Sequence, residues 1–261
     1  MSKKMQDRAD QIMKLLLRSG SVNVDELALK TRSSAPSIRR DLARLEQRGL
    51  ILRTHGGAAL VEPLLYEPFR NDITFQAREA RHAEEKRRIG LAAAELVQQH
   101  DTIGIIAGTT TTQVGRALRH RSGIHVMTNA INIGMELCNQ PAIRTTMTGG
   151  VLAWVWAFAL VGPHALQTLE DINLDRVFLS VTGFDLNRGA TTLEMEEATV
   201  ARKMAAQSRQ VVVVADSSKI GLVGPSVICP IDRVDVLVTD QGLASSKRKE
   251  IERAGVQVIC C

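Results

Sequence analysis

The stretch from residue 33 to residue 58 constrains this chain most, because it combines an amphipathic helix with a short hairpin that turns at glycines. Ser34 suits the N-cap of that helix, where its hydroxyl could accept a hydrogen bond from the first turn. One side of the helix is apolar and is expected to face a core: Ile38, Leu42 and Leu45. The other side carries hydroxyl and charged groups: Ser37, Arg39, Arg40, Asp41 and Arg44. Because guanidinium groups suit guanine edges and phosphates alike, such a helix could enter a DNA major groove.

The hairpin that follows the helix has the form of a wing. Gly49 is expected to end the helix, and a β-segment then turns at Gly56 and Gly57. Arg53 and His55 lie on this hairpin, where they could reach the DNA backbone or the minor groove.

A basic amphipathic helix is often only a solvated surface helix, and charge alone favours that alternative. The sequence upstream reverses the preference. Residues 7–18 have a helical apolar pattern, and Asn23 is placed to cap a second helix that carries Leu27 inward. Helix, short extended piece, helix, tight turn, helix and hairpin is the element order of a winged helix-turn-helix domain, predicted here over residues 1–60.

The distribution of charge supports the same interpretation. Residues 1–60 contain 12 Lys and Arg against 6 Asp and Glu, whereas the remaining residues contain 21 against 22. The excess positive charge, formally +5 for the whole chain, therefore lies with the predicted DNA-binding domain, as phosphate binding requires.

The motifs R-R-D-L-x-x-L-E-x-x-G and R-x-H-G-G-A, within residues 8–58, resemble the DNA-binding end of DeoR-type bacterial repressors. The resemblance implies double-stranded operator DNA as a partner. It also implies DNA contacts from the residues that the helix and hairpin present: Ser34, Ser37, Arg39, Arg40, Arg44, Arg53, His55, Gly56 and Gly57.

Beyond the hairpin the pattern changes to that of an α/β protein. Residues 61–73 contain two prolines and no clear period, so they are expected to form a linker. Residues 74–99 favour one helix with a solvated, charged first half, and β-branched runs then alternate with helical segments to the end of the chain. This alternation predicts an α/β domain with a largely parallel sheet over residues 74–261.

Ligands of such sheets bind beyond the carboxyl ends of the strands. After the first predicted strand, a glycine and a run of threonines begin a helix, where amides and hydroxyls could hold an anion. The lysine of a nucleotide-binding P-loop is missing, which disfavours ATP. The candidate residues at the strand ends are Gly108, Thr109, Thr110, Thr111, Thr128, Asn129, Gly149, Gly150, Gly183, Asp185 and Lys219. Each alone is more often a cap or a turn, but together they favour a small phosphorylated polyol.

This second half also resembles DeoR-type proteins, in their effector-binding domain. The matching landmarks G-T-T-T, T-N-A, T-G-G, V-G-P, T-G-F-D, A-D-S-S-K and V-T-D span about residues 75–259. The resemblance implies a fold similar to ribose-5-phosphate isomerase, a phosphorylated sugar as effector, and Glu197 as a further effector-binding residue.

Two segments depart from the family pattern. Ile106 stands where the family commonly has an Asp, which removes a polar contact to a sugar hydroxyl or an acid–base group. Residues 152–160 are more apolar than usual, and Trp154, Trp156 and Phe158 would share one face of a strand there. A buried strand or a subunit contact is favoured over an aromatic floor for the ligand.

The main prediction is therefore a repressor of a carbohydrate-utilisation operon whose operator affinity changes when a phosphorylated sugar binds. One alternative is an isomerase-like enzyme fused to a DNA-binding head, with Asp185, Glu197 and Lys219 as acid–base groups. Another is a constitutive DNA binder with a degenerate sensor, which the Ile106 change favours slightly.

Neither a cofactor nor a metal ion is expected, because the four cysteines lack the paired short spacings of a zinc site. The longest apolar run, residues 151–161, falls short of the ~20 residues that span a bilayer, so we expect no membrane partner and a cytoplasmic protein. A homo-oligomer, a dimer or a tetramer, is expected because paired DNA-binding domains match repeated half-sites in DNA.

Overall fold

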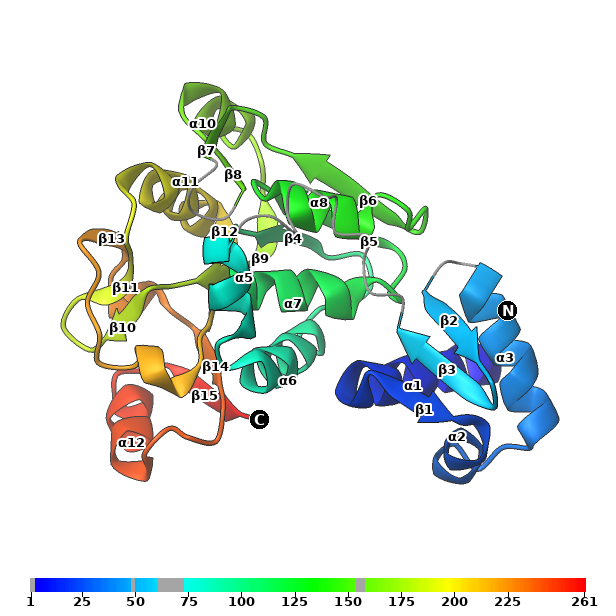
Figure 1. Ribbon diagram of the computed structural model, residues 1–261. Coiled ribbons are helices and arrows are strands. Elements are labelled where there is room, and N and C mark those ends of the chain that lie inside the picture. Colours follow the sequence, from blue (N-terminus) through cyan, green and yellow to red (C-terminus); the bar gives the residue numbers. More distant parts are fainter. Residues whose placement is uncertain (1–2, 48–49, 61–72, 154–157) are drawn as a thin grey trace. The chain divides into compact units, whose positions relative to one another are not determined.

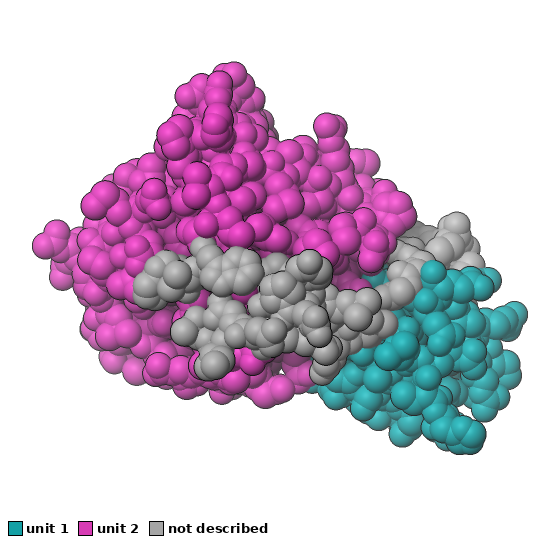
Figure 2. Space-filling model, turned by 45° about the horizontal axis from the view of Figure 1, so that its top comes forward, with its two compact units in different colours: residues 1–66 teal, residues 67–261 magenta. Residues whose placement is uncertain are grey.

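The computed structural model describes residues 3–47, 50–60, 73–153 and 158–261 (Figure 1). The chain forms two compact units, Met1–Tyr66 and Glu67–Cys261, which Figure 2 shows in different colours. Gly49, Trp154, Trp156 and residues 61–72 of the expected linker lie outside the described residues. Predictions about those residues stay predictions.

The first unit has the element order predicted for a winged helix-turn-helix. Its elements are α1 (Lys3–Ser19), β1 (Ser21–Asn23), α2 (Val24–Lys30), α3 (Ala35–Gln47), β2 (Ile51–Thr54) and β3 (Gly57–Leu60). The three strands pair antiparallel in the order β1-β3-β2. The apolar stripe of α3 is buried as predicted and packs with Ile12, Leu16 and Leu27 of the first two helices: Ile38, Leu42 and Leu45.

Local hydrogen bonds explain where two helices of this unit begin. The side chain of Asn23 accepts from the backbone N–H of Glu26 at 2.7 Å, so the predicted cap of α2 is confirmed. At α3 the backbone carbonyl of Ser34 accepts from the N–H groups of Ser37 and Ile38. The Ser34 hydroxyl itself lies 3.0 Å from the Ser37 hydroxyl, so its predicted role as a side-chain cap is wrong.

The prediction that Asp41 lies on the DNA-facing side of α3 is also wrong. Its side chain is 3% exposed and accepts a hydrogen bond from Nε of Arg8, on α1. A buried carboxylate requires a partner, and this ion pair also ties α3 to α1.

The second unit is built on seven parallel strands in the order β15-β14-β12-β9-β4-β5-β6. They are β4 (Thr102–Ile105), β5 (Ile124–Thr128), β6 (Ile143–Met147), β9 (Leu174–Ser180), β12 (Ser208–Val214), β14 (Val236–Thr239) and β15 (Gln257–Cys260). The helices are α5 (Ile73–Ala80), α6 (Ala83–Ala94), α7 (Thr109–Leu118), α8 (Ile131–Leu137), α10 (Pro163–Thr168), α11 (Met195–Ala206) and α12 (Ser245–Arg253), with 3-10 turns η1 (Ser217–Lys219) and η2 (Ile231–Arg233). The predicted parallel α/β sheet is confirmed.

Helices cover both faces of this sheet (Figure 1). Residues of α6, α7 and α8 pack on one face, with Val212 and Val214 of β12, and residues of α10, α11 and α12 pack on the other, with Val211 and Val213. Successive side chains of a strand point to opposite faces, so a strand buried on both sides reads as a continuous apolar run.

Two smaller sheets complete the unit, and the sequence did not indicate them. The strands β10 (Gly183–Asp185), β11 (Gly189–Thr192) and β13 (Ser226–Cys229) form an antiparallel sheet. The strands β7 (Val151–Ala153) and β8 (Ala159–Val161) pair antiparallel, so residues 152–160 do not form the single strand that was expected. Phe158, just before β8, is buried and packs against Phe75 of α5 with ring centroids 5.3 Å apart.

The single helix expected over residues 74–99 is two helices. The chain turns between α5 and α6 at Arg81 and His82, and His82 has a left-handed φ of +57°. The charged stretch is not wholly a solvated face either, because the side chain of Lys86 is 5% exposed. The break brings Arg78 of α5 and Lys86 of α6 to the same pocket of the second unit.

Candidate functional site

The predicted DNA-binding residues of α3 and of the hairpin differ in exposure. Seven of the nine are exposed: Ser34, Arg39, Arg40, Arg44, Arg53, His55 and Gly56. Ser37 is half-buried and Gly57 is buried. A Cβ at position 57 would lie 2.4 Å from the backbone oxygen of Val22, so Gly57 allows β3 to approach β1.

Two arginines of this surface, Arg40 and Arg53, have only weak contacts with other described residues. Nε of Arg40 donates to the carbonyl of Pro36 at 3.4 Å, and Arg53 lies 3.9 Å from Glu46 in an exposed ion pair. Exposed pairs of this kind contribute about 0–1 kcal/mol, so such guanidinium groups can exchange them for phosphate or base contacts.

The second unit contains a pocket of about 230 Å³ at the carboxyl ends of β4, β5, β9 and β12. The chain order runs outward from β4 through β5 to β6, and outward on the other side from β9 through β12, β14 and β15. The pocket therefore lies where the strand order reverses, which is where open α/β sheets bind ligands.

One wall of the pocket is the beginning of α7. Gly108 is the N-cap residue and has a φ of +154°, and a Cβ there would lie 2.4 Å from the side chain of Ser180. Among the described residues no side chain caps α7, while the hydroxyls of Thr111 and Thr112 donate to the carbonyl of Gly108 at 3.0 and 2.7 Å. The first backbone N–H groups of a helix have no partner within it, so this end of α7 favours an anion.

Cationic side chains surround this helix end. Arg78, Arg81, Lys86 and Lys219 all line the pocket. The ammonium of Lys86 donates to the carbonyl oxygens of Arg78 and Arg81, and burial lowers the pKa of Lys86 while nearby Asp216 opposes that shift. Within the described residues, the side chain of Lys219 makes no hydrogen bond or ion pair with the protein, which leaves it available to a ligand.

Asp240 holds the loop that carries Lys219. It accepts from the backbone N–H and the hydroxyl of Ser217 at 2.6 and 2.9 Å, and from the N–H of Gly242 at 2.7 Å. Burial alone would raise the pKa of Asp240, but these hydrogen bonds lower it below its ordinary value. A permanently charged carboxylate therefore fixes the loop from outside the pocket.

Glu197, on α11, differs from Asp240 because its pKa is raised and not lowered. It lines the pocket, and its Oε1 is buried with no hydrogen-bond partner in the described part of the chain. Burial raises the pKa of Glu197 to about 7, Glu194 adds to the shift, and Arg78 and a hydrogen bond from Thr192 oppose it. Near neutral pH the carboxyl group can therefore keep its proton and donate a hydrogen bond, or lose it and accept one.

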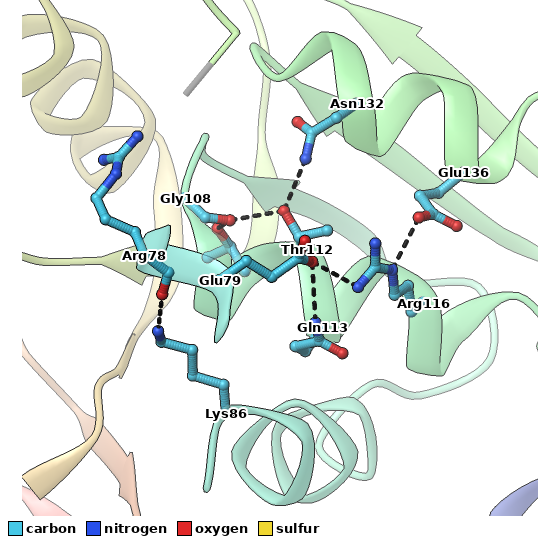
Figure 3. Close-up of polar contacts among 10 residues, drawn as sticks. Arg78, Glu79, Lys86, Gly108, Thr112, Gln113, Arg116, Asn132 and Glu136 are labelled. Carbon is cyan, nitrogen blue, oxygen red and sulfur yellow. Dashed lines mark hydrogen bonds and ion pairs between the residues drawn. The ribbon is translucent and has the colours of Figure 1, made fainter. Parts of the chain in front are cut away.

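A polar network behind the pocket joins α5, α7 and α8 (Figure 3). Nη1 of Arg116 lies 2.6 Å from Glu79 of α5, and its Nε lies 2.8 Å from Glu136 of α8. In addition, Asn132 of α8 donates to the hydroxyl of Thr112 at 2.8 Å. The helix that begins at the pocket is thus tied to both of its neighbours.

The structure brings together about half of the effector-binding residues predicted from the sequence. Those that line the pocket are Gly108, Thr109, Thr110, Asn129, Glu197 and Lys219. Those that do not are Thr111, Thr128, Gly149, Gly150, Gly183 and Asp185. The hydroxyl of Thr128 donates to the carbonyl of Ile105, and Asp185 accepts from the N–H groups of Asn187 and Arg188, so both side chains hold turns or strand ends.

The sequence-based prediction missed other residues of the pocket, in particular Arg78, Arg81, His82, Lys86, Thr192, Asp216 and Ser218. Asp216 and Ser218 belong to the A-D-S-S-K motif noted for the family resemblance, so that motif indicated this part of the pocket. Ile106 also lines the pocket, at the position where an Asp is common in the family.

The described residues contain no group of three His, Cys, Asp or Glu side chains placed to hold a metal ion. None of their helices combines the length and the apolar character needed to cross a membrane.

Comparison with known proteins identifies both units. A model of the DeoR-like helix-turn-helix domain matches residues 8–63, and one of the DeoR C terminal sensor domain matches residues 81–241. The putative aga operon transcriptional repressor of Escherichia coli O157:H7 is 32% identical over 97% of this chain and 93% of its own length. The glycerol-3-phosphate regulon repressor of Escherichia coli K12 is 31% identical over 91% of each chain.

Among solved structures, ribose 5-phosphate isomerase from Plasmodium falciparum matches 52% of this chain and 51% of its own, at 17% identity and a TM-score of 0.38. Both of these relatives are named as transcriptional repressors, in agreement with the main prediction of a regulator. The chain belongs to the DeoR family of transcriptional regulators, with an N-terminal helix-turn-helix domain and a C-terminal sensor domain.

Proposed function

We propose that this regulator represses a carbohydrate-utilisation operon, reads its operator through α3 and the β2–β3 hairpin, and changes its operator affinity when a phosphorylated sugar occupies the pocket of the second unit. The observation that carries the proposal is the uncapped start of α7 beside Lys219, at the point where the strand order reverses. The name of one relative, the glycerol-3-phosphate regulon repressor, points to the same ligand class.

The pocket offers different chemistry to the two ends of such a ligand. The amides at Gly108, Thr109 and Thr110, with the ammonium of Lys219, suit a phosphate group. Glu197, with an unpartnered buried oxygen, suits a sugar hydroxyl. The phosphate supplies charge that the cations recognise, and the hydroxyl contacts select among phosphorylated compounds.

We also propose a homo-oligomer, because two copies of α3 are needed to read two half-sites of an operator. Since operator binding requires the protein to share a compartment with the chromosome, we propose a cytoplasmic location. Sedimentation of the protein with and without a duplex of two half-sites tests the first of these proposals.

An Arg40→Ala variant is expected to lose operator affinity by roughly 10- to 100-fold, the range for losing one base contact from an arginine. Arg40 is exposed, so the fold of the first unit is expected to be unchanged. Fluorescence anisotropy with a duplex selected from a random pool by the wild-type protein measures the loss. The matched control is Arg18→Ala, which removes an exposed arginine from the end of α1. Equal losses in both variants would exclude α3 as the reading helix.

A Lys219→Ala or Thr110→Ala variant is expected to bind operator as the wild type does but to ignore the effector, because the anion site is weakened. A thermal-shift panel of phosphorylated hexoses, pentoses, amino sugars and polyols first identifies a ligand of the wild type, and operator anisotropy then measures the response. Lys249→Ala, an exposed substitution on α12, is the control. If the operator affinity of both pocket variants responds to the effector as that of the wild type does, the effector does not bind at this site. If no compound of the panel binds the wild type, a constitutive DNA binder with a degenerate sensor is favoured.

A further inference from the structure

We propose that Glu79 and Arg116 are positioning residues that transmit occupancy of the pocket to the segment leading to the DNA-binding unit, by holding the short helix α5 against α7. This inference rests on the proposed function, because it assigns the path by which the same pocket acts on operator affinity.

The position of α5 in the chain makes it suitable for this role. The helix runs from Ile73 to Ala80 and directly follows the segment 61–72, which joins it to the winged helix-turn-helix unit. A displacement of α5 therefore moves the start of the connection between the two units. An eight-residue helix is marginal by itself, so its position depends on the side chains that anchor it.

Described residues of three neighbouring elements anchor α5. Phe75 is buried against Phe158, with the rings 62° apart in an edge-to-face contact. The carboxylate of Glu79 lies 2.6 Å from Nη1 of Arg116 on α7. At its carboxyl end the helix is held by Lys86 of α6, whose ammonium donates to the carbonyl of Arg78 (Figure 3) and also to that of Arg81.

Two of these anchors belong to elements that form the pocket. Arg116 lies on the same helix as Thr109 and Thr110, which line the pocket, and a helix of ten residues shifts as one body. Lys86 lines the pocket itself. An anion that binds beside Lys86 competes with the two backbone carbonyls for its ammonium and so loosens the carboxyl end of α5. The Glu79–Arg116 ion pair then determines whether α5 moves together with α7.

The charges around Arg116 allow this link to be cut selectively. Arg116 lies between Glu79 and Glu136, and the side chain of Glu136 is 4% exposed and bound to Nε of Arg116 at 2.8 Å. Removing the charge of Glu79 weakens its contacts with Arg116 and with Gln113, which donates to Glu79 at 3.5 Å, but it leaves the half-buried guanidinium with a partner and the α7–α8 contact in place. Arg116 itself is unsuitable for substitution, because its loss would leave Glu136 buried without a partner.

The decisive variant is Glu79→Gln in the full chain, with Glu84→Gln as its matched control. Glu84 forms an exposed ion pair with Arg87 within α6, so its substitution changes the same charge without touching the α5–α7 contact. Glycerol 3-phosphate, glucose 6-phosphate and inorganic phosphate serve as probes. Calorimetry measures the affinity for each probe, and anisotropy measures operator affinity with and without it.

We expect E79Q to bind probe and free operator like the wild type, while the probe-dependent change in operator affinity, about tenfold for an ordinary allosteric coupling, falls below about threefold. We also expect faster hydrogen exchange across residues 73–80 in E79Q than in E84Q. Unchanged coupling in E79Q overturns the inference and leaves the proposed function intact. A wild type that binds none of the probes, or binds one without a change in operator affinity, overturns the proposed function and this inference together.

Discussion

An Asp41→Asn variant is expected to lose about 3 kcal/mol of the stability of the first unit and, as a result, most of its operator binding. Asp41 is buried on α3 and pairs with Arg8 of α1, and Nη1 of Arg44 lies 3.7 Å from it. Without the carboxylate, the guanidinium of Arg8 loses its counter-charge in a partly buried position. The loss is at the low end of the range for a buried pair, because Arg8 is still 20% exposed.

Hydrogen exchange over peptides from α1 and α3, together with operator anisotropy, measures this effect without interference from the second unit. Asp7→Asn is the matched control, since Asp7 is exposed and lies next to Arg8 on the same helix. Similar exchange rates in the two variants would show that the Arg8–Asp41 pair does not stabilise the helix-turn-helix.

Asp41 also shows what the sequence could predict about the first unit and what it could not. Helical spacing correctly placed Ile38, Leu42 and Leu45 in the core, because amphipathic periodicity is a local property of the chain. The same spacing placed Asp41 on the opposite side. Its partner Arg8 lies 33 residues earlier, and no local pattern reports a contact at that separation.

In the second unit, too, features set by local sequence could be predicted, whereas contacts between distant parts of the chain could not. The β-branched runs predicted the parallel strands and the helices between them, because strands buried on both faces read as apolar runs. The short strands of the two smaller sheets gave no such signal. Strand order was also inaccessible, since the pairing of β4 with β9 joins segments some seventy residues apart in the sequence.

The pocket was partly predictable for the same reason. Gly108, Thr109, Thr110, Asn129 and Lys219 lie within five residues after the end of a strand, so the rule that ligands bind at the carboxyl ends of strands found them. The cationic residues of the α5–α6 region follow no strand. In the sequence they resemble a solvated charged helix, and only the turn at His82 and the burial of Lys86 bring them to the pocket.

A Glu197→Gln variant is expected to become more stable relative to the wild type as pH rises, by up to about 3 kcal/mol between pH 4.5 and pH 7. In the folded protein, burial raises the pKa of Glu197 to about 7, from an ordinary value of 4.5. Between these values the unfolded chain has released the proton and the folded protein still holds it. Rising pH therefore favours the unfolded state of the wild type, and glutamine, which does not ionise, removes this dependence.

Urea denaturation at pH 4.5 and at pH 8, followed by tryptophan fluorescence, measures the expected change, because both tryptophans belong to the second unit. Any cost of burying the glutamine amide is the same at both pH values, so it cancels from the difference. Glu196→Gln, an exposed substitution next to Glu197 on α11, controls for the loss of one negative charge. If the stabilities of E197Q and the wild type run parallel over this range, Glu197 ionises near its ordinary pKa in the folded protein. It would then be a permanent carboxylate in the pocket, able only to accept hydrogen bonds from a ligand.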